Sequence, residues 1–224
     1  MTVFAWRVLV AGSLAIALSA GEGGAAGKKV LDFEKSETGK MPDGFTAALT
    51  GAGGPVAWMI AEDPSAPSPP KILAQSSTET IEDRFPLCIY DAVTAKDLAT
   101  SVRFKVVQGK VDRAAGLAVR LRGPDDYYVV RANAREDDVR LYKVVGGKRS
   151  ELAGTKVPVS PEEWHTLKLD ARGRHFVVSF DGRRLFEADD ATFAGPGKVA
   201  LWTKADSVTF FDDLEIEPRD ARKR

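Results

Sequence analysis

Hydrophobic and polar residues alternate with a period of two along most of the chain after residue 27, and clusters of Gly, Pro and Asp separate the alternating runs. The pattern predicts strands at 30–34, 45–49, 56–61, 71–75, 87–91, 98–107, 115–122, 126–134, 138–145, 163–170, 174–181, 183–187, 198–204 and 207–217. Turns such as "FDGRR" and "VGGKR" carry the glycine signatures of hairpins. Many short strands joined by tight turns favour an all-β protein, with two antiparallel sheets in a jelly-roll sandwich.

The N-terminal segment has a different character. Arg7 supplies positive charge, Val8–Ala20 is apolar, and small residues follow up to Ala26. This order is typical of a secretory signal peptide that is cleaved after about Ala26. We therefore expect a secreted or periplasmic protein without a membrane span in the mature chain; a retained membrane anchor is the alternative. Residues 27–218 then form one β-sandwich domain, followed by a polar tail at 219–224.

Composition narrows the classes of partner. The chain has 32 Lys and Arg residues and 32 Asp and Glu residues, so its formal net charge is zero. A net positive charge that would attract nucleic acid or an anionic membrane is therefore absent from the sequence as a whole. Cys88 is the only cysteine, which rules out a disulfide within the chain. Its apolar neighbours in "FPLCIYD" favour a buried core residue over a nucleophile. The proline-rich tract at 61–70 is expected to be a surface loop within the domain.

Three consecutive segments carry a family resemblance: "GLAVRLRGPDDYYVVRANAREDDVRLYKVVGGKRSEL", "EEWHTLKLDARGRHFVVSFDGRRLFEADD" and "GPGKVALWTKADSVTFFDDLEI". Their order resembles that of bacterial secreted concanavalin A-like (laminin-G-like) domains, especially those of the 3-keto-disaccharide hydrolase-like family. The resemblance covers about 28–217 and is strongest over 116–217. It implies a two-sheet jelly roll whose concave sheet faces a glycan, so carbohydrate is the expected partner.

The catalytic pattern departs from that family. Its members carry an acidic residue followed by glutamine on a strand that here reads "DYYVVRANA". Glucanases of the same fold use the order E-x-D-x-x-E, which this chain does not contain. Catalytic residues are therefore not assigned, and a glycan-binding domain is the main hypothesis. An active glycosidase or keto-sugar hydrolase or lyase, with acidic residues that remain to be located, is one alternative. A non-enzymatic envelope module that binds protein is the other.

Alternation also assigns side chains to faces. Apolar residues such as Leu117, Val130, Leu141 and Leu201 fix the inward phase of four strands, and their neighbours point outward. If these strands share a sheet, aromatic, cationic and amide side chains gather on its outer face. Aromatic rings stack on sugars, while guanidinium and amide groups bind hydroxyls or carboxylates. The alternative is an ordinary exposed β surface. The candidate ligand-binding residues are Arg120, Tyr127, Arg131, Asn133, Arg140, Tyr142, Trp202 and Lys204.

Acidic residues suggest a second kind of site, where the chain closes on its own beginning. The phase set by Leu214 and Ile216 predicts that Asp212 faces the core and Asp213 faces outward. First and last strands of jelly rolls often lie side by side, which would bring Asp212 close to Glu34. Like charges at short distance repel one another, and calcium prefers carboxylate oxygens. The resemblance to sugar-binding jelly rolls implies a structural calcium at Glu34 and Asp212. A solvated carboxylate pair, or an ion pair with a lysine, is the alternative.

Overall fold

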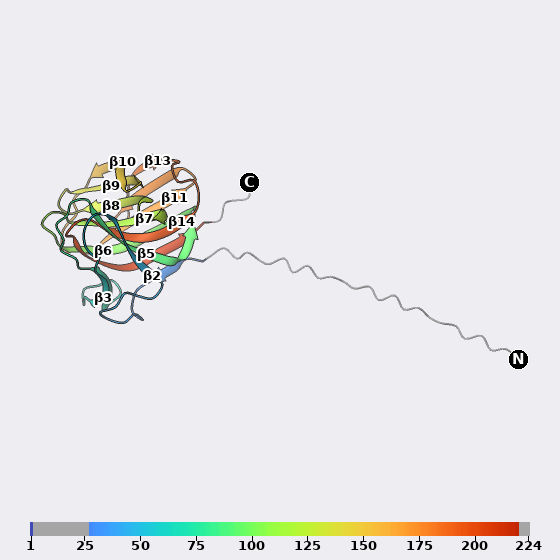
Figure 1. Cartoon of the computed structure of the whole chain (residues 1–224), viewed down its shortest axis with the longest axis horizontal. Helices are drawn as coiled ribbons and strands as arrows, with labels where there is room; N and C mark the ends of the chain where they lie inside the picture. Colours follow the sequence, from blue (N-terminus) through green and yellow to red (C-terminus); the bar gives the residue numbers. More distant parts are fainter. Residues whose placement is uncertain (2–26, 220–224) are drawn as a thin grey trace.

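The computed structural model describes Met1 and residues 27–219 and contains two antiparallel β-sheets packed face to face (Figure 1). The predicted signal peptide and polar tail lie outside the described residues, apart from Met1 and Arg219. The described residues contain strands and no α-helix, and therefore no helix that could cross a membrane. The predicted two-sheet antiparallel sandwich is confirmed.

The first sheet, here called the eight-stranded sheet, forms one layer of the sandwich. Its first strand, β1 (Lys29–Leu31), pairs with β15, and the main path is β13 (Arg183–Asp189), β12 (His175–Phe180), β11 (His165–Arg172), β6 (Leu98–Gln108), β15 (Val208–Pro218), β4 (Lys71–Gln75) and β3 (Trp58–Glu62). The pairing of β1 with β15, which places Leu31 opposite Leu214, confirms that the first and last strands are neighbours.

The second sheet has seven strands and faces the first across the core. Its spatial order is β10 (Lys148–Lys156), β9 (Asp138–Val145), β8 (Asp126–Asn133), β7 (Ala114–Gly123), β14 (Gly197–Thr203), β5 (Arg84–Ala95) and β2 (Phe45–Gly51). The strand β10 lies at one edge and was not predicted. Its residues are mostly polar and none is fully buried, so the hydrophobic alternation that marks a half-buried strand is weak there.

The main core lies between the sheets and follows the predicted inward phase. Side chains such as Phe104, Leu167, Val130, Leu201 and Ile216 are fully buried in it. Cys88 is also fully buried, and burial raises the pKa of its thiol, as expected of an inert core residue. The proline-rich segment between β3 and β4 is a loop, as predicted.

The seven-stranded sheet curls so strongly that its two ends meet over its outer face. By register, Tyr127 lies at the β7–β8 hairpin, whereas Thr50 pairs with Phe85 at the other end of the sheet. Nevertheless, the Thr50 hydroxyl lies 2.9 Å from the Tyr127 hydroxyl and also donates a hydrogen bond to the Pro124 carbonyl. A second apolar cluster therefore forms on this outer face, beneath the hairpin ends.

Two β-bulges reverse the predicted direction of side chains. In β7 the register shifts after Val119, and Arg120 has a φ of 51°, so its side chain turns to the inner side of the sheet. In β15 the register shifts between Asp212 and Glu215, with Asp213 at a φ of 45°. As a result Asp212 is buried beneath the loop that contains Ser68 rather than in the core between the sheets. The predicted phases of Arg120 and Asp212 were therefore wrong.

Candidate functional site

The outer face of the seven-stranded sheet brings together most of the residues predicted to bind a ligand. In this sheet Val129 of β8 lies opposite Tyr142 of β9, and Arg131 lies opposite Arg140. Gly116 of β7 separates Arg131 from Trp202 of β14, so these side chains occupy one continuous row. Six of the eight candidates sit on the paired strands of this face or at its edge: Tyr127, Arg131, Asn133, Arg140, Tyr142 and Trp202. Lys204 follows directly after β14.

Arg120 does not belong to this face. Its guanidinium donates hydrogen bonds to the backbone carbonyls of Lys96 at 2.8 Å, Phe193 at 3.1 Å and Gly173 at 2.6 Å. It also lies over the Phe176 ring, with 5.2 Å between the guanidinium carbon and the ring centre. Burial lowers the pKa of Arg120. Arg120 thus joins three loops at one end of the core and is not placed to meet a ligand on the outer face.

The aromatic part of the site is buried. The indole N–H of Trp202 donates to the Tyr127 hydroxyl at 3.2 Å, and both side chains are fully buried. Phe85 stacks on Trp202 with ring centres 5.4 Å apart and an angle of 14° between the planes. Burial raises the pKa of Tyr127 to about 12. These rings form a floor beneath the surface rather than an exposed platform for a sugar.

Arg149, on the edge strand β10, covers this floor. Its guanidinium carbon lies 4.7 Å from the centre of Phe85, 4.9 Å from Tyr142 and 5.8 Å from Trp202. A guanidinium over ring faces at these distances makes favourable cation–π contacts. Its Nη1 atom is buried and has no hydrogen-bond partner in the described part of the chain, although the side chain as a whole is half-buried. A ligand approaching this face therefore meets the exposed part of the Arg149 side chain first, and it reaches the enclosed Nη1 only if that side chain moves.

A charged network surrounds the aromatic floor on the β8–β10 side. Arg131 donates to Asp138 and Glu136 at 2.6 Å each and to the Tyr142 hydroxyl at 3.2 Å. Arg140 bridges Asp138 at 2.7 Å and Glu151 at 2.6 Å. Burial alone lowers the pKa of Arg131, but Tyr142, Asp138 and Glu136 outweigh it and raise the pKa above its usual value. The network fixes the guanidinium planes of Arg131 and Arg140 along one row of the sheet.

Loops complete the polar end of the face. Lys204 pairs with Asp112 at 2.7 Å, and the Asn133 amide donates to the same carboxylate at 2.8 Å. Asp206 accepts the backbone N–H groups of residues 110–112 at 2.7 to 3.0 Å. Burial alone raises the pKa of Asp206, but these donors outweigh it and lower the pKa below its usual value. Asp206 therefore holds the loop that places Asp112 beside Lys204.

The carboxylates of this face bind cations of the protein itself. Asp138 uses one oxygen for Arg131 and the other for Arg140 and the more distant Lys156. Glu136 and Glu151 are half-exposed and each pairs with an arginine. Hydrolysis of a glycosidic bond needs one carboxylic acid that can give up a proton and a second carboxylate directed at the sugar. The observed pairing holds arginines in place and favours binding over catalysis.

The predicted calcium site lies at the seam between the chain ends. One oxygen of Asp212 accepts the Ser68 N–H at 2.8 Å, and one oxygen of Glu34 accepts the Lys71 N–H at 2.7 Å. Burial, together with the charges of Asp213 and Glu34, raises the pKa of Asp212 to about 6. Within residues 27–219, no three acidic, histidine or cysteine side chains are grouped so that they could hold a metal ion. Calcium at Glu34 and Asp212 stays a prediction, for which the donor set is small.

Several residues of the site were missed from the sequence, among them Asp138, Asp112, Arg149 and Phe85. Asp138 begins β9 in the same outward phase as Arg140 and Tyr142, so alternation could have included it. Asp112 and Arg149 lie in a loop and in the unpredicted strand β10, where period-two alternation of apolar residues gives little signal. Phe85 lies just before the predicted start of its strand, because β5 begins at Arg84.

Comparisons with known proteins agree with the fold. No family model matches the chain. A levanase of Bacillus subtilis (strain 168) is 28% identical over 91 residues, which are 40% of this chain and 13% of the levanase. The chain thus matches only a small part of that enzyme.

Solved structures resemble the whole sandwich. The carbohydrate-binding module CBM66 of Bacillus subtilis has a TM-score of 0.63 and 20% identity, and the match covers 78% of this chain and 95% of the module. A Bacillus subtilis protein of unknown function with a galectin-like fold has a TM-score of 0.55 and 13% identity, over 77% and 90% of the two chains. The carbohydrate recognition domain of Emp47p has a TM-score of 0.57 and 9% identity, over 85% and 95%. At these identities the likeness shows the fold, which is the predicted jelly-roll sandwich.

Proposed function

We propose that this protein is a secreted carbohydrate-binding β-sandwich that takes a glycan on the outer face of its seven-stranded sheet. The observation that carries the proposal is Arg149, whose half-buried side chain covers three aromatic rings on this face. Sugar hydroxyls accept hydrogen bonds from guanidinium N–H groups, and ordered guanidinium groups give directional recognition.

The neighbouring side chains extend this surface. Arg140 and Glu151 are partly exposed beside Arg149, and both are held in a fixed pairing. Fixed donors and acceptors lose little conformational entropy when a ligand binds. The buried rings of Phe85, Tyr142 and Trp202 support the arginine from below. In this proposal the three rings hold the Arg149 guanidinium in place, and the guanidinium contacts the sugar. The rings themselves stack on the sugar only if the Arg149 side chain moves aside.

The comparisons support a carbohydrate as the ligand class. Two of the similar structures are a carbohydrate-binding module and a carbohydrate recognition domain, and the sequence match is to a part of a levanase. The name of that enzyme makes levan, a fructose polymer, the first polysaccharide to test. The resemblance to the 3-keto-disaccharide hydrolase-like family extends the proposal to short oligosaccharides. Binding, rather than hydrolysis, is proposed because the carboxylates of this face are engaged by arginines.

Secretion is part of the proposal and rests on the N-terminal sequence. An apolar stretch after Arg7 and small residues up to Ala26 are typical of a cleaved signal peptide. Expression in a bacterial host, followed by mass spectrometry of the periplasmic fraction, is expected to show a mature chain that begins near Gly27. A chain that keeps its N-terminus in the membrane fraction would contradict cleavage.

Affinity electrophoresis against a panel of polysaccharides, with levan included, tests the binding function. We expect at least one polysaccharide to retard the wild-type protein, and Arg149→Ala to abolish that retardation. Lys148→Ala is the matched control because it removes an exposed positive charge from the neighbouring position of β10. Equal loss in both variants, or no retardation of the wild type by any polysaccharide, would contradict the proposal.

A further inference from the structure

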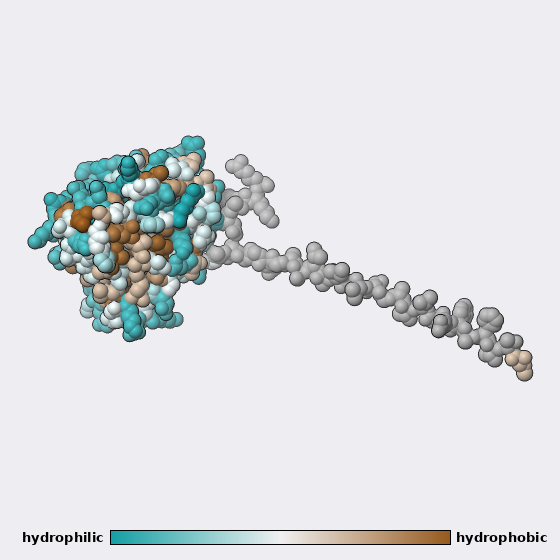
Figure 2. Space-filling model, in the orientation of Figure 1, coloured by the Kyte–Doolittle hydropathy of each residue, from teal (hydrophilic) through white to brown (hydrophobic). Residues whose placement is uncertain are grey.

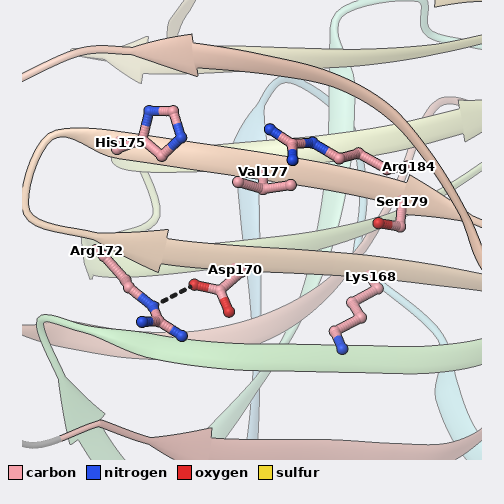
Figure 3. A pocket seen from close by; sticks show the side chains of 7 residues that line it. All are labelled: Lys168, Asp170, Arg172, His175, Val177, Ser179 and Arg184. Carbon is pink, nitrogen blue, oxygen red and sulfur yellow. Dashed lines mark hydrogen bonds and ion pairs between the residues drawn. The ribbon is translucent and has the colours of Figure 1, made fainter.

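The outer face of the eight-stranded sheet, on the opposite side of the molecule, contains a shallow trough. It has a volume of about 420 Å³ and is formed by strands β11, β12 and β13 (Figure 3). Its lining residues are Lys168, Asp170, Arg172, His175, Val177, Ser179 and Arg184. The trough therefore lies on a different sheet from the site around Arg149.

The trough arises from side-chain size along three neighbouring strands. The outward residues Val177 and Ser179 of the middle strand are small and half-buried, and they form the floor. Lys168 of β11 lies opposite Ser179 on one side, and Arg184 of β13 lies opposite Ser179 on the other side. At the other end of the trough Arg172 lies opposite His175. Long cationic side chains thus border a short, partly apolar floor.

The acidic groups near the trough are already engaged. Asp170 pairs with Arg172 at 3.0 Å and with Arg219 at 3.1 Å, as the dashed line in Figure 3 shows for Arg172. His175 lies 2.9 Å from both Glu187 and Asp189, and Glu187 also pairs with Arg184. In the described part of the chain, no carboxylate lies within ion-pair distance of Lys168.

The lining itself carries more positive than negative charge, although the whole chain is balanced. It holds the three permanent cations Lys168, Arg172 and Arg184 and the carboxylate of Asp170. Arg172 pairs with Asp170, and Arg184 pairs with Glu187 just outside the lining, so Lys168 is the lining cation without an ion pair among residues 27–219. The complete sequence has 32 basic and 32 acidic residues, so this excess is a local feature. Positive charge lining a recessed surface raises the local concentration of anions.

From this arrangement we infer that the trough is a second binding site, for the acidic groups of an anionic polysaccharide. The cations stand on both sides and at both ends of a floor that runs from His175 to Ser179, roughly 13 Å along an extended strand. This spread suits a polymer with repeated carboxylate or sulfate groups better than one small anion. Val177 offers an apolar contact for a sugar ring. Lys168 offers charge-assisted hydrogen bonds, and so does Arg184 through the N–H groups that Glu187 does not engage.

A flat anionic membrane or a nucleic acid duplex fits the surface less well. Either one would engage cations that protrude from a basic face, whereas these cations border a hollow and the chain has no net positive charge. The polysaccharide is therefore the occupant proposed, and binding to lipid or DNA is an outcome that the experiment must separate.

Isothermal titration at about 0.15 M salt with a sulfated polysaccharide (heparin) and a carboxylated one (polygalacturonate) tests the inference and shows which acidic group is preferred. We expect the double variant Lys168→Ala/Arg184→Ala to weaken binding by about tenfold or more, since two charge-assisted contacts are lost. The charge-matched control is Lys29→Ala/Lys148→Ala, which removes two exposed lysines away from the trough and should retain affinity.

A third variant tests the floor itself. Ser179→Asp places a negative charge between Lys168 and Arg184 and should abolish binding, whereas Ser179→Ala should reduce it only slightly. Circular dichroism confirms that each variant keeps its β structure. Equal losses in the trough and control variants, or tighter binding to anionic vesicles or duplex DNA than to either polysaccharide, would overturn the inference. Because Arg149→Ala leaves the trough intact, failure of the glycan site and failure of this second site give different patterns.

Discussion

The guanidinium carbon of Arg149 lies 4.7 Å from the centre of the Phe85 ring, although Arg149 is on the edge strand β10 and Phe85 is on β5, next to the opposite edge of the seven-stranded sheet. The contact exists because the sheet curls until the β9–β10 and β7–β8 hairpins reach the strands at the far edge. Because of this curl, the outer face of the seven-stranded sheet contains a second buried apolar cluster, which includes Tyr127 and Trp202. The polar surface above that cluster is what a ligand can reach. Figure 2 shows one side of the domain, where apolar and weakly polar surface lies between more hydrophilic regions.

Removing the Arg149 side chain should weaken the fold and open the aromatic floor. We expect Arg149→Ala to lower the free energy of unfolding by about 1 kcal/mol, the usual size of a cation–π contribution. It should also make Trp202 more accessible to acrylamide quenching, measured as the difference from a Trp202→Phe background. Lys148→Ala, which changes the same hairpin, should alter neither quantity. Unchanged quenching in Arg149→Ala would contradict a covering role for this side chain.

Asp138 should be the most important acidic residue for the stability of the site. Asp138→Asn removes the buried charge partner of Arg131 and leaves only the half-exposed Glu136, and loss of one partner in a buried pair costs about 3 to 5 kcal/mol. Urea denaturation is expected to show this loss. The half-exposed Glu151 provides the comparison, because Glu151→Gln should cost about 1 kcal/mol or less. Similar urea midpoints for the two variants would show that the Arg131–Asp138 pair does not make the larger contribution to stability.

Asp206 should make the fold sensitive to acid. Its pKa is lower in the folded protein than the usual value of 3.8, because it accepts N–H groups from residues 110–112. The stabilisation is present above pH 3.8 and is lost as pH falls through the folded pKa. Asp206→Asn should lower stability at neutral pH by about 1 to 3 kcal/mol, as expected for buried donors left poorly paired. The difference between wild type and variant should shrink below pH 3.8; a constant difference would contradict this origin.

The seam between the chain ends gives a direct test of calcium. Asp212 and Glu34 each accept a backbone N–H, and no larger cluster of metal ligands occurs within residues 27–219. If the predicted calcium is bound, removing it leaves Asp212 and Glu34 without a cation between them, so we expect a chelator to lower the thermal midpoint of the protein. Excess calcium chloride should restore the midpoint, and magnesium chloride should not. A midpoint that neither chelator nor calcium changes would contradict the ion predicted at Glu34 and Asp212.

Alternation predicted faces correctly wherever the strands are regular. Tyr142 and Arg140 point outward and inward neighbours such as Leu141 lie in the core, because the period of two is a property of the local backbone. The phases of Arg120 and Asp212 were wrong because each lies at a bulge, and a single extra residue reverses every later side chain.

Burial could not be predicted in the same way. Trp202 was assigned to the correct face but is completely covered, because the curl of the whole sheet brings residues 149 and 85 over it. That curl depends on contacts between distant segments, such as Thr50 with Tyr127, and has no signature in either segment alone. The edge strand β10 was missed for a related reason, since an exposed edge does not need an apolar alternation.

The most direct test of the carbohydrate-binding proposal is a crystal structure of the protein soaked with an oligosaccharide of the polysaccharide that retards it. We expect sugar on the outer face of the seven-stranded sheet, with a hydroxyl accepting a hydrogen bond from the Arg149 guanidinium and further contacts to Arg140 or Glu151. A sugar bound only in the trough of the eight-stranded sheet, or one bound on the seven-stranded sheet without contact to Arg149, would contradict the proposal.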